Sequence, residues 1–251
     1  MAEAILEAVG LSKQFGALAA VNNVTLGFES GRVHAVIGPN GAGKTTFLNL
    51  LSGEMRPSAG NVRFKGQDIT GAPPNRISQL GIGRSFQRTN IFLALTCLEN
   101  CWIAAQSRLP SSMRFVRPAH RLTSVREQAE RALATCGLAA RAGAVAAAMS
   151  YGEQRQLEIG MMLAARPELL LLDEPLAGMG HDESLQVIDL LRRLAADHTL
   201  ILIEHDMDAV FSIADRITVM VNGEVLETGS IEQIRGSPAV QEAYLGREDA
   251  E

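Results

Sequence analysis

The chain has 251 residues, of which 47% are hydrophobic and 20% are charged, and its formal net charge is −5 at pH 7. This composition is typical of a globular protein that is long enough to bury a substantial core. The negative charge and the aromatic content of 4% argue against a nucleic-acid partner, because phosphates need clustered Lys and Arg and unpaired bases need aromatic rings.

Targeting and metal-binding patterns are also missing from the sequence. The N-terminus lacks a basic stretch followed by an apolar run, and no apolar run approaches the ~20 residues that span a bilayer. We therefore expect a cytoplasmic protein that reaches a membrane only through partners. Cys97, Cys101 and Cys136 are widely spaced and lack a zinc-ligand pattern, so we expect them to be buried and reduced.

The first part of the chain predicts a small antiparallel sheet. Apolar and polar residues alternate in Ile5–Val9, Val24–Phe28 and Asn61–Phe64, which is the period of a half-buried strand. The apolar run Arg32–Ile37 is followed instead by a helical pattern over Gly43–Leu51. Such alternation predicts strand–helix–strand units in a mainly parallel sheet with helices on both faces.

The segment after Arg32–Ile37 has the P-loop pattern, which is a Gly, four residues and then Gly-Lys-Ser/Thr. Its glycines let backbone N–H groups curl around phosphate oxygens, and the following helix N-terminus adds partial positive charge. We expect Lys44 to reach the β- and γ-phosphates and the Thr45 hydroxyl to bind Mg²⁺. The predicted nucleotide contacts are Gly38, Pro39, Asn40, Gly41, Ala42, Gly43, Lys44, Thr45 and Thr46.

In residues 92–166, Ala-rich helical patterns replace the strand patterns. This change predicts a helical insertion within a single domain of residues 1–251, whose nucleotide-binding core and β subdomain comprise residues 1–91 and 167–251. Inside the insertion, Arg108–Thr123 is rich in Pro, Ser and Arg. It is either a solvated loop, which we favour, or a contact to a partner or to acidic lipid.

Beyond the insertion, the parallel pattern continues. Glu168–Leu172 precedes a helical pattern at Asp182–Ala195, and Thr199–Ile203 precedes another at Met207–Ile213. Asn222-Gly223 between two apolar runs predicts a hairpin with a type I′ turn.

Asp173 and Glu174 directly follow the leucine run of Glu168–Leu172, which we predict to be a buried central strand. Ligands of α/β sheets bind at the carboxyl ends of strands, and adjacent carboxylates beside an apolar strand are unfavourable without a cation. We therefore predict that Asp173 ligates Mg²⁺, directly or through water, and that Glu174 is the base that orients the attacking water. His205 ends a second apolar strand that topology would bring beside the first, where it could contact the γ-phosphate and that water.

Three further segments resemble motifs of the ATP-binding subunits of ABC transporters. Ser150-Tyr151-Gly152-Glu153-Gln154 resembles the signature motif, Gln87 holds the Q-loop position, and Phe15 matches the aromatic residue that stacks on adenine. The resemblance covers essentially the whole chain and implies an α/β P-loop NTPase fold, ATPase activity, and ATP and Mg²⁺ as cofactors. It implies Lys44, Gln87, Glu174 and His205 as catalytic residues, Thr45, Gln87 and Asp173 as metal ligands, and Ser150, Gly152 and Glu153 as nucleotide contacts.

More narrowly, the chain resembles the branched-chain (hydrophobic) amino-acid uptake subfamily in Gly81–Thr89, in the Ser-Tyr-Gly-Glu-Gln form of the signature, in Glu204–Met207 and in Ala243–Gly246. Related importers of urea, amides or aromatic acids share much of this pattern. The chain departs from the family pattern at Tyr151, which replaces the first glycine of the signature, and at Gly180, which stands where many members have the D-loop aspartate. The second departure leaves the coupling between two ATP sites open.

In this family the signature completes an ATP site on the other protomer. One P-loop and one signature therefore imply a head-to-tail dimer with a second copy or with a related ATPase. The resemblance also implies two membrane permease subunits at the inner face of the cell membrane and, indirectly, an extracytoplasmic substrate-binding protein. Permease coupling helices would dock near Gln87 and Arg88–Leu95, where Ile91, Phe92 and Leu93 either form the dock or pack in the core.

Other classes of P-loop protein fit the sequence less well. A GTPase would carry an Asn-Lys-x-Asp guanine-reading motif, which the sequence lacks. A non-transport ABC ATPase of DNA repair or translation typically has a long coiled coil or tandem cassettes. A pure binding module would have no need of Asp173, Glu174 and His205.

Overall fold

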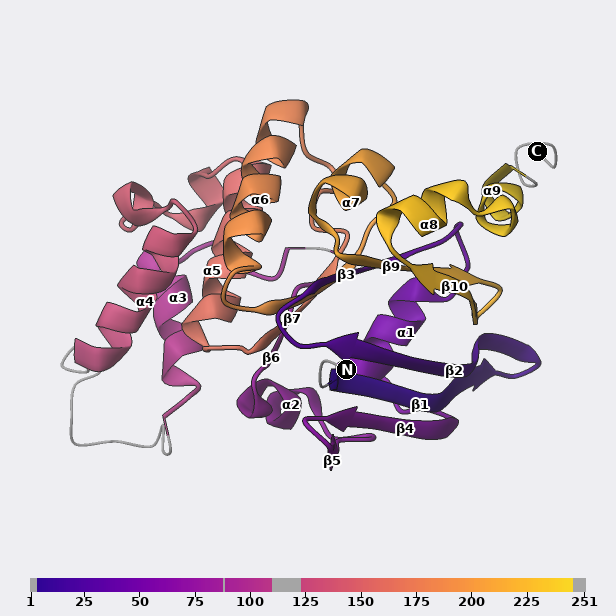
Figure 1. Ribbon diagram of the computed structural model, residues 1–251. Coiled ribbons are helices and arrows are strands. Elements are labelled where there is room, and N and C mark those ends of the chain that lie inside the picture. Colours follow the sequence, from indigo (N-terminus) through magenta and orange to yellow (C-terminus); the bar gives the residue numbers. More distant parts are fainter. Residues whose placement is uncertain (1–3, 88, 110–122, 246–251) are drawn as a thin grey trace.

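The computed structural model describes residues 4–87, 89–109 and 123–245 of the chain (Figure 1). The strands are β1 (Ala4–Phe15), β2 (Leu18–Glu29), β3 (Val33–Ile37), β4 (Ala59–Phe64), β5 (Gln67–Asp68), β6 (Ile82–Arg84), β7 (Leu169–Asp173), β8 (Thr199–Ile203), β9 (Arg216–Val221) and β10 (Glu224–Gly229). The helices are α1 (Lys44–Leu51), α2 (Pro74–Leu80), α3 (Cys97–Gln106), α4 (Thr123–Thr135), α5 (Tyr151–Ala164), α6 (His181–Leu194), α7 (Met207–Ile213), α8 (Ile231–Gly236) and α9 (Pro238–Leu245). Among the described residues, two short 3-10 helices, η2 (Ala139–Arg141) and η3 (Ala146–Ala148), precede α5.

Within the described residues, the strands form two sheets. An antiparallel sheet has the order β2-β1-β4-β5, and a larger sheet has the order β10-β9-β3-β8-β7-β6. In the larger sheet all neighbours are parallel except β9 and β10. These two strands join through Asn222 and Gly223, whose φ angles of 50° and 82° fit a type I′ turn. The predicted parallel sheet, antiparallel patch and hairpin are all confirmed.

The central strand β7 is buried on both faces. Leu169 and Leu171 pack into a core shared with α1 and the antiparallel sheet, whereas Leu170 and Leu172 pack into a core shared with α3–α6. Side chains alternate across a strand, and full burial of each leucine contributes about 1.5–3 kcal/mol. Figure 1 shows the consequence: α3–α6 gather at one end of the molecule and the antiparallel sheet lies at the other.

Two of the helices at the first end, α3 and α5, begin at capping side chains. Thr96 caps α3 and Ser150 caps α5, each in a capping box with the glutamate three residues later. The predicted state of the cysteines is confirmed, because Cys97, Cys101 and Cys136 are buried and free. Burial raises the pKa of the Cys101 thiol to about 12, so it stays protonated at neutral pH.

Much of the basic segment Arg108–Thr123 lies outside the described residues, as do Arg88 and Gly246 of the segments that resemble the uptake subfamily. Arg108 itself is anchored, since its Nη2 donates to the carbonyl oxygen of Arg166 at 3.0 Å. Across residues 4–87, 89–109 and 123–245, no helix combines the length and the apolar character needed to cross a bilayer.

Candidate active site

Sheet order brings three distant segments together. The P-loop follows β3, Asp173 ends β7, and His205 lies just past the end of β8. Strand β8 lies between β3 and β7, and the three strands are parallel. Their carboxyl ends therefore meet at one edge of the sheet, which is where ligands of α/β folds bind.

The P-loop needs glycine at two positions where the backbone is left-handed and tightly packed. Gly38 has φ 150°, and a Cβ there would lie 2.0 Å from the Met220 carbonyl oxygen. Gly43 has φ 93°, and a Cβ there would lie 2.1 Å from the Ala20 carbonyl oxygen. Gly43 is also the N-cap of α1, so the loop leads directly into a helix N-terminus that favours anions.

Lys44 lies folded over this loop. Its Nζ donates to the carbonyl oxygens of Gly38 at 2.7 Å and Pro39 at 3.1 Å. Burial lowers the pKa of Lys44, and the nearby carboxylates of Glu174 and Asp173 partly offset that shift. Phosphate oxygens are stronger acceptors than carbonyls because they are charged, so the ammonium group is placed to exchange its partners for a nucleotide.

A cavity of about 530 Å³ opens over the P-loop. Its lining includes Asn40 to Thr46 of the loop, together with Phe15, Gln87 and Glu174. Phe15 is 48% exposed, so part of this aromatic residue is accessible to a base. The cavity thus combines anion-binding backbone, a cation and an aromatic surface, as a nucleotide requires.

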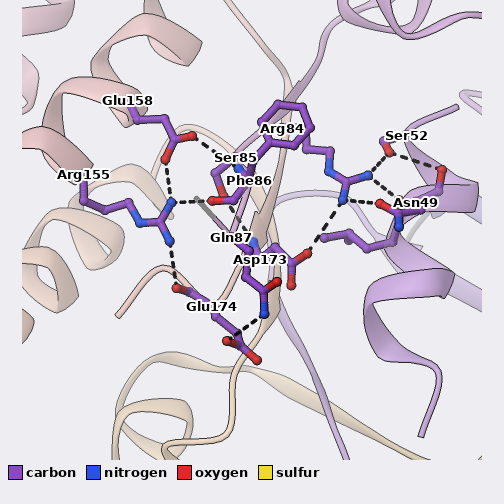
Figure 2. Close-up of polar contacts among 11 residues, drawn as sticks. Asn49, Ser52, Arg84, Ser85, Phe86, Gln87, Arg155, Glu158, Asp173 and Glu174 are labelled. Atoms are coloured by element: carbon purple, nitrogen blue, oxygen red, sulfur yellow. Dashed lines mark hydrogen bonds and ion pairs between the residues drawn. The ribbon is translucent and has the colours of Figure 1, made fainter. Parts of the chain in front are cut away.

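Asp173 is buried at 1% exposure and has an unusual set of partners (Figure 2). Its backbone N–H donates to Ser85 Oγ at 3.1 Å, and its Oδ2 lies 3.7 Å from Arg84 Nη2. Its Oδ1 is buried with no hydrogen-bond partner in the described part of the chain. Burial raises the pKa of this carboxyl group. A buried carboxylate oxygen without a donor fits a cation or a cation-bound water.

Glu174 has a strained backbone at the mouth of this site. Its φ of 47° is left-handed for a residue with a side chain, and such strain costs about 1–3 kcal/mol. The side chain is directed to other predicted residues: Oε2 accepts from Gln87 Nε2 at 3.4 Å, and Oε1 lies 3.9 Å from His205 Nδ1. The structure therefore brings Glu174, Gln87 and His205 together.

Sequence reasoning missed a buried ion pair behind these residues. Arg155 and Glu158 on α5 lie 2.6 Å apart and are almost completely inaccessible to solvent. Figure 2 shows that they bind the segment containing Phe86 and the backbone of Glu174. The available signal was a pair of opposite charges three residues apart that flank Leu157, within a helix whose other core residues are apolar.

The signature residues lie apart from the P-loop cavity, and none of them is among the described residues that line it. The Glu153 carboxylate closes the capping box of α5 and pairs with Arg141 at 3.1 Å. Ser150 Oγ donates to Glu183 Oε1 at 2.7 Å, and the Gly152 N–H donates to the same oxygen at 3.3 Å. Two of the three nucleotide contacts predicted in the signature, Ser150 and Gly152, are thus bonded to one carboxylate oxygen within the chain.

The two departures from the family pattern have different structural settings. Tyr151 lies against Gly178, where an added Cβ would be 3.4 Å from its Cε1. Gly180 has φ −71° and ψ 164°, and an added Cβ would meet nothing within 4 Å. Backbone geometry therefore does not require glycine at position 180, and the chain has room there for a side chain.

Comparisons with known proteins agree with this geometry. Residues 21–177 match the family model described as ABC transporter. The chain is 42% identical to BraF, the high-affinity branched-chain amino acid transport ATP-binding protein of Pseudomonas aeruginosa, over 98% of this chain and 99% of that protein. It is 38% identical to LivG of Escherichia coli, which has the same description, over 98% and 99% of the two chains.

A solved structure shows the same fold over nearly the whole chain. The ADP conformation of MJ1267, an ATP-binding cassette of an ABC transporter, matches with a TM-score of 0.86 and 30% identity, covering 97% of this chain and 99% of that chain. The expected α/β fold of an ABC ATPase is therefore confirmed. The chain belongs to the ABC transporter family, within which it is an ATP-hydrolysing cassette.

Proposed function

We propose that this cassette powers an importer of branched-chain or other hydrophobic amino acids. The observation that carries the proposal is the identity of 42% to BraF over 98% of the chain, a protein described as serving branched-chain amino acid transport. Importers of urea, amides or aromatic acids are the alternative cargo class, since their ATPases resemble this chain in the same segments.

Each residue at the sheet edge has a role in the proposed reaction. Lys44 and the P-loop amides bind the phosphates, Phe15 stacks on adenine, Glu174 accepts the proton of the attacking water, and Gln87 and His205 orient the reacting groups. Thr45, Gln87 and Asp173 would hold Mg²⁺, and the unpartnered Asp173 Oδ1 supports this choice. When bound, Mg²⁺ neutralises charge between the β- and γ-phosphates.

The surface for the permease subunits would lie beside the Q-loop, between the nucleotide-binding core of residues 1–91 and 167–251 and the helical part of residues 92–166. Phe92 and Leu93 are 49% and 51% exposed there, whereas Ile91 packs against the core. The first two therefore fit a dock, and Ile91 fits core packing. This arrangement would place the cassette at the inner face of the membrane, with the extracytoplasmic binding protein contacting only the permeases.

Two cassettes would share two ATP sites, because the chain has one P-loop and one signature that do not meet. In each site the γ-phosphate would be bound by Ser150 and by the Gly152 N–H of the opposite cassette. Within the isolated chain, Glu183 already bonds both groups, and these bonds lower the pKa of its carboxyl group. A phosphate that enters must therefore displace this carboxylate.

The shared site can be tested by light scattering on the Glu174→Gln variant, with and without Mg-ATP. We expect a shift from monomer to dimer on adding ATP. Adding Glu183→Ala should lower the ATP concentration at half-maximal dimerisation several-fold, because it removes a negative charge that competes with the phosphate. Glu183→Gln is the matched control. It removes the negative charge but keeps an acceptor oxygen, so it separates the effect of the charge from the effect of the lost hydrogen bonds. An ATP-bound protein that stays monomeric would mean that self-pairing is wrong.

The cargo can be tested by uptake in cells that lack this chain. Labelled leucine, isoleucine and valine should enter more slowly, and the parent chain should restore their uptake whereas Glu174→Gln should not. Equal expression of the two chains, checked by immunoblot, makes hydrolysis the only difference between them. Unchanged leucine uptake with a loss of urea, amide or aromatic-acid uptake would favour the alternative class.

A further inference from the structure

We propose that Arg155, together with Glu158, is a positioning residue for Glu174. From helix α5 it fixes the backbone conformation of Glu174, whose side-chain carboxylate acts as base. The proposal rests on the proposed role of Glu174. It concerns side chains that no phosphate, water or metal contact requires, because both are buried behind the site (Figure 2).

The backbone conformation of Glu174 needs support from its surroundings. A left-handed backbone at a residue with a side chain persists only where the surroundings hold it. Here the Glu174 N–H donates to the Ile203 carbonyl oxygen on β8 at 2.9 Å. Its own carbonyl oxygen accepts from Arg155 Nη2 at 3.0 Å and from the Ala177 N–H at 3.1 Å. The peptide is therefore held by the sheet from one side and by α5 from the other.

The guanidinium of Arg155 also binds the Q-loop. Arg155 Nη1 donates to the Phe86 carbonyl oxygen at 2.6 Å, so its two terminal nitrogens span Phe86 and Glu174. Glu158 Oε1 accepts from the Phe86 N–H at 3.3 Å and the Asn90 N–H at 3.1 Å. Gln87, which lies between these two amides, donates to the Glu174 side chain. One ion pair thus fixes the positions of both Gln87 and Glu174, which contact each other.

The buried Arg155–Glu158 ion pair makes contacts that apolar side chains at these positions could not make. Transfer of two charges from water to the interior is costly, and well-packed apolar residues often give equal or greater stability. A methionine pair could fill the same space, but it could not donate to two carbonyl groups. The planar fork of an arginine can do so, whereas the single ammonium of a lysine cannot match its geometry. What the pair adds is therefore the relative placement of three segments.

The consequence is a mechanical connection between the two halves of the shared site. Ser150, the residue predicted to contact the nucleotide of the opposite cassette, is the N-cap of helix α5, and Arg155 is on the second turn of that helix. A displacement of α5 relative to the sheet would move Gln87 and the Glu174 peptide together. Docking of the signature onto ATP would therefore be transmitted to the base of the same chain.

The test is the double variant Arg155→Met/Glu158→Met, which removes the pair without leaving a buried charge alone. We expect kcat for ATP to fall by about 10–10²-fold, as a misplacement of about 1 Å in a catalytic group can cost. The dissociation constant for a fluorescent ATP analogue should stay close to that of the parent, whereas the midpoint of thermal unfolding should fall, because backbone groups of Phe86 and Asn90 lose their partners. The matched control is Arg126→Met/Glu130→Met, which removes an exposed ion pair of α4 and should leave kcat unchanged.

A second measurement separates positioning from general damage. On a Glu174→Gln background, the Arg155→Met/Glu158→Met change should cause no further loss of kcat, because groups that act as a unit are not additive. Independent losses that multiply, or a parental kcat in the double variant, would overturn the proposal. If the double variant does not fold, Arg155→Lys takes its place in the test. It keeps a charge opposite Glu158 but cannot span both carbonyl groups, so its kcat should also fall.

The rate of the Glu174→Gln variant alone distinguishes the role of Glu174 as base from the positioning role of Arg155. Near-parental hydrolysis by that variant would remove the base assignment and the positioning role with it. Slow hydrolysis by Glu174→Gln, together with parental kcat in the Arg155 variants, would overturn only the positioning role.

Discussion

Replacing Glu174 with glutamine is expected to slow ATP hydrolysis by about 10²–10⁴-fold, the usual contribution of a positioned base, while ATP binding persists. The amide keeps the shape of the side chain and can still accept the hydrogen bond from Gln87, which measures 3.4 Å in the parent. It cannot accept a proton from water. Single-turnover hydrolysis at saturating Mg-ATP measures the chemical step directly.

The control for this prediction is Glu168→Gln, because Glu168 is a half-exposed carboxylate beside Lys65 and does not line the P-loop cavity. This variant should hydrolyse ATP like the parent. If Glu174→Gln also turned over at near-parental rate, another group would have to be the base.

Replacing Lys44 with alanine is expected to weaken ATP binding by roughly 10²-fold or more, since each hydrogen bond to a charged group contributes about 1.5–3 kcal/mol. The Lys44 ammonium bonds the Gly38 and Pro39 carbonyl oxygens at 2.7 Å and 3.1 Å, so it already lies at the loop that cradles the phosphates. Isothermal titration with Mg-ATP measures the dissociation constant.

Lys65→Gln is the matched control for the lysine variant. Lys65 is about half exposed, pairs with Glu168 and does not line the cavity. Its variant should bind ATP like the parent, which shows that lost positive charge alone is not the cause. Parental affinity in Lys44→Ala would mean that the phosphate assignment is wrong.

Local features of the fold were predictable wherever a short segment carries its own physical cause. The leucine run before Asp173 predicts a strand buried on both faces, and Asn222-Gly223 predicts its turn. The first strand shows the limit of this reasoning. The alternation predicted Ile5–Val9, but β1 continues to Phe15, because Gly10 has φ 57° and the register with β2 shifts between Ala8 and Leu11. A bulge reverses which side chains face inward, so the pattern ends before the strand does.

The candidate site likewise contains residues that the sequence predicted and residues that it did not. The sequence alone predicted the P-loop, the Asp173-Glu174 pair and the other motif residues as site residues, because their residue types and their order can be read from short segments. It did not predict which side chains support them. Arg155 and Glu158 had only their apolar neighbours in the helix as a local sign of burial, and no local pattern shows that Glu183 bonds Ser150 and Gly152.

Only the tertiary structure decided those partners. The order β3-β8-β7 brings the P-loop, His205 and Glu174 to one edge, although β8 comes after β7 in the chain. Packing of α5 against the sheet then buries Arg155 behind Glu174. The physical reason is that a contact between distant segments depends on the arrangement that buries the most apolar surface with satisfied polar groups, and that arrangement is a property of the whole chain.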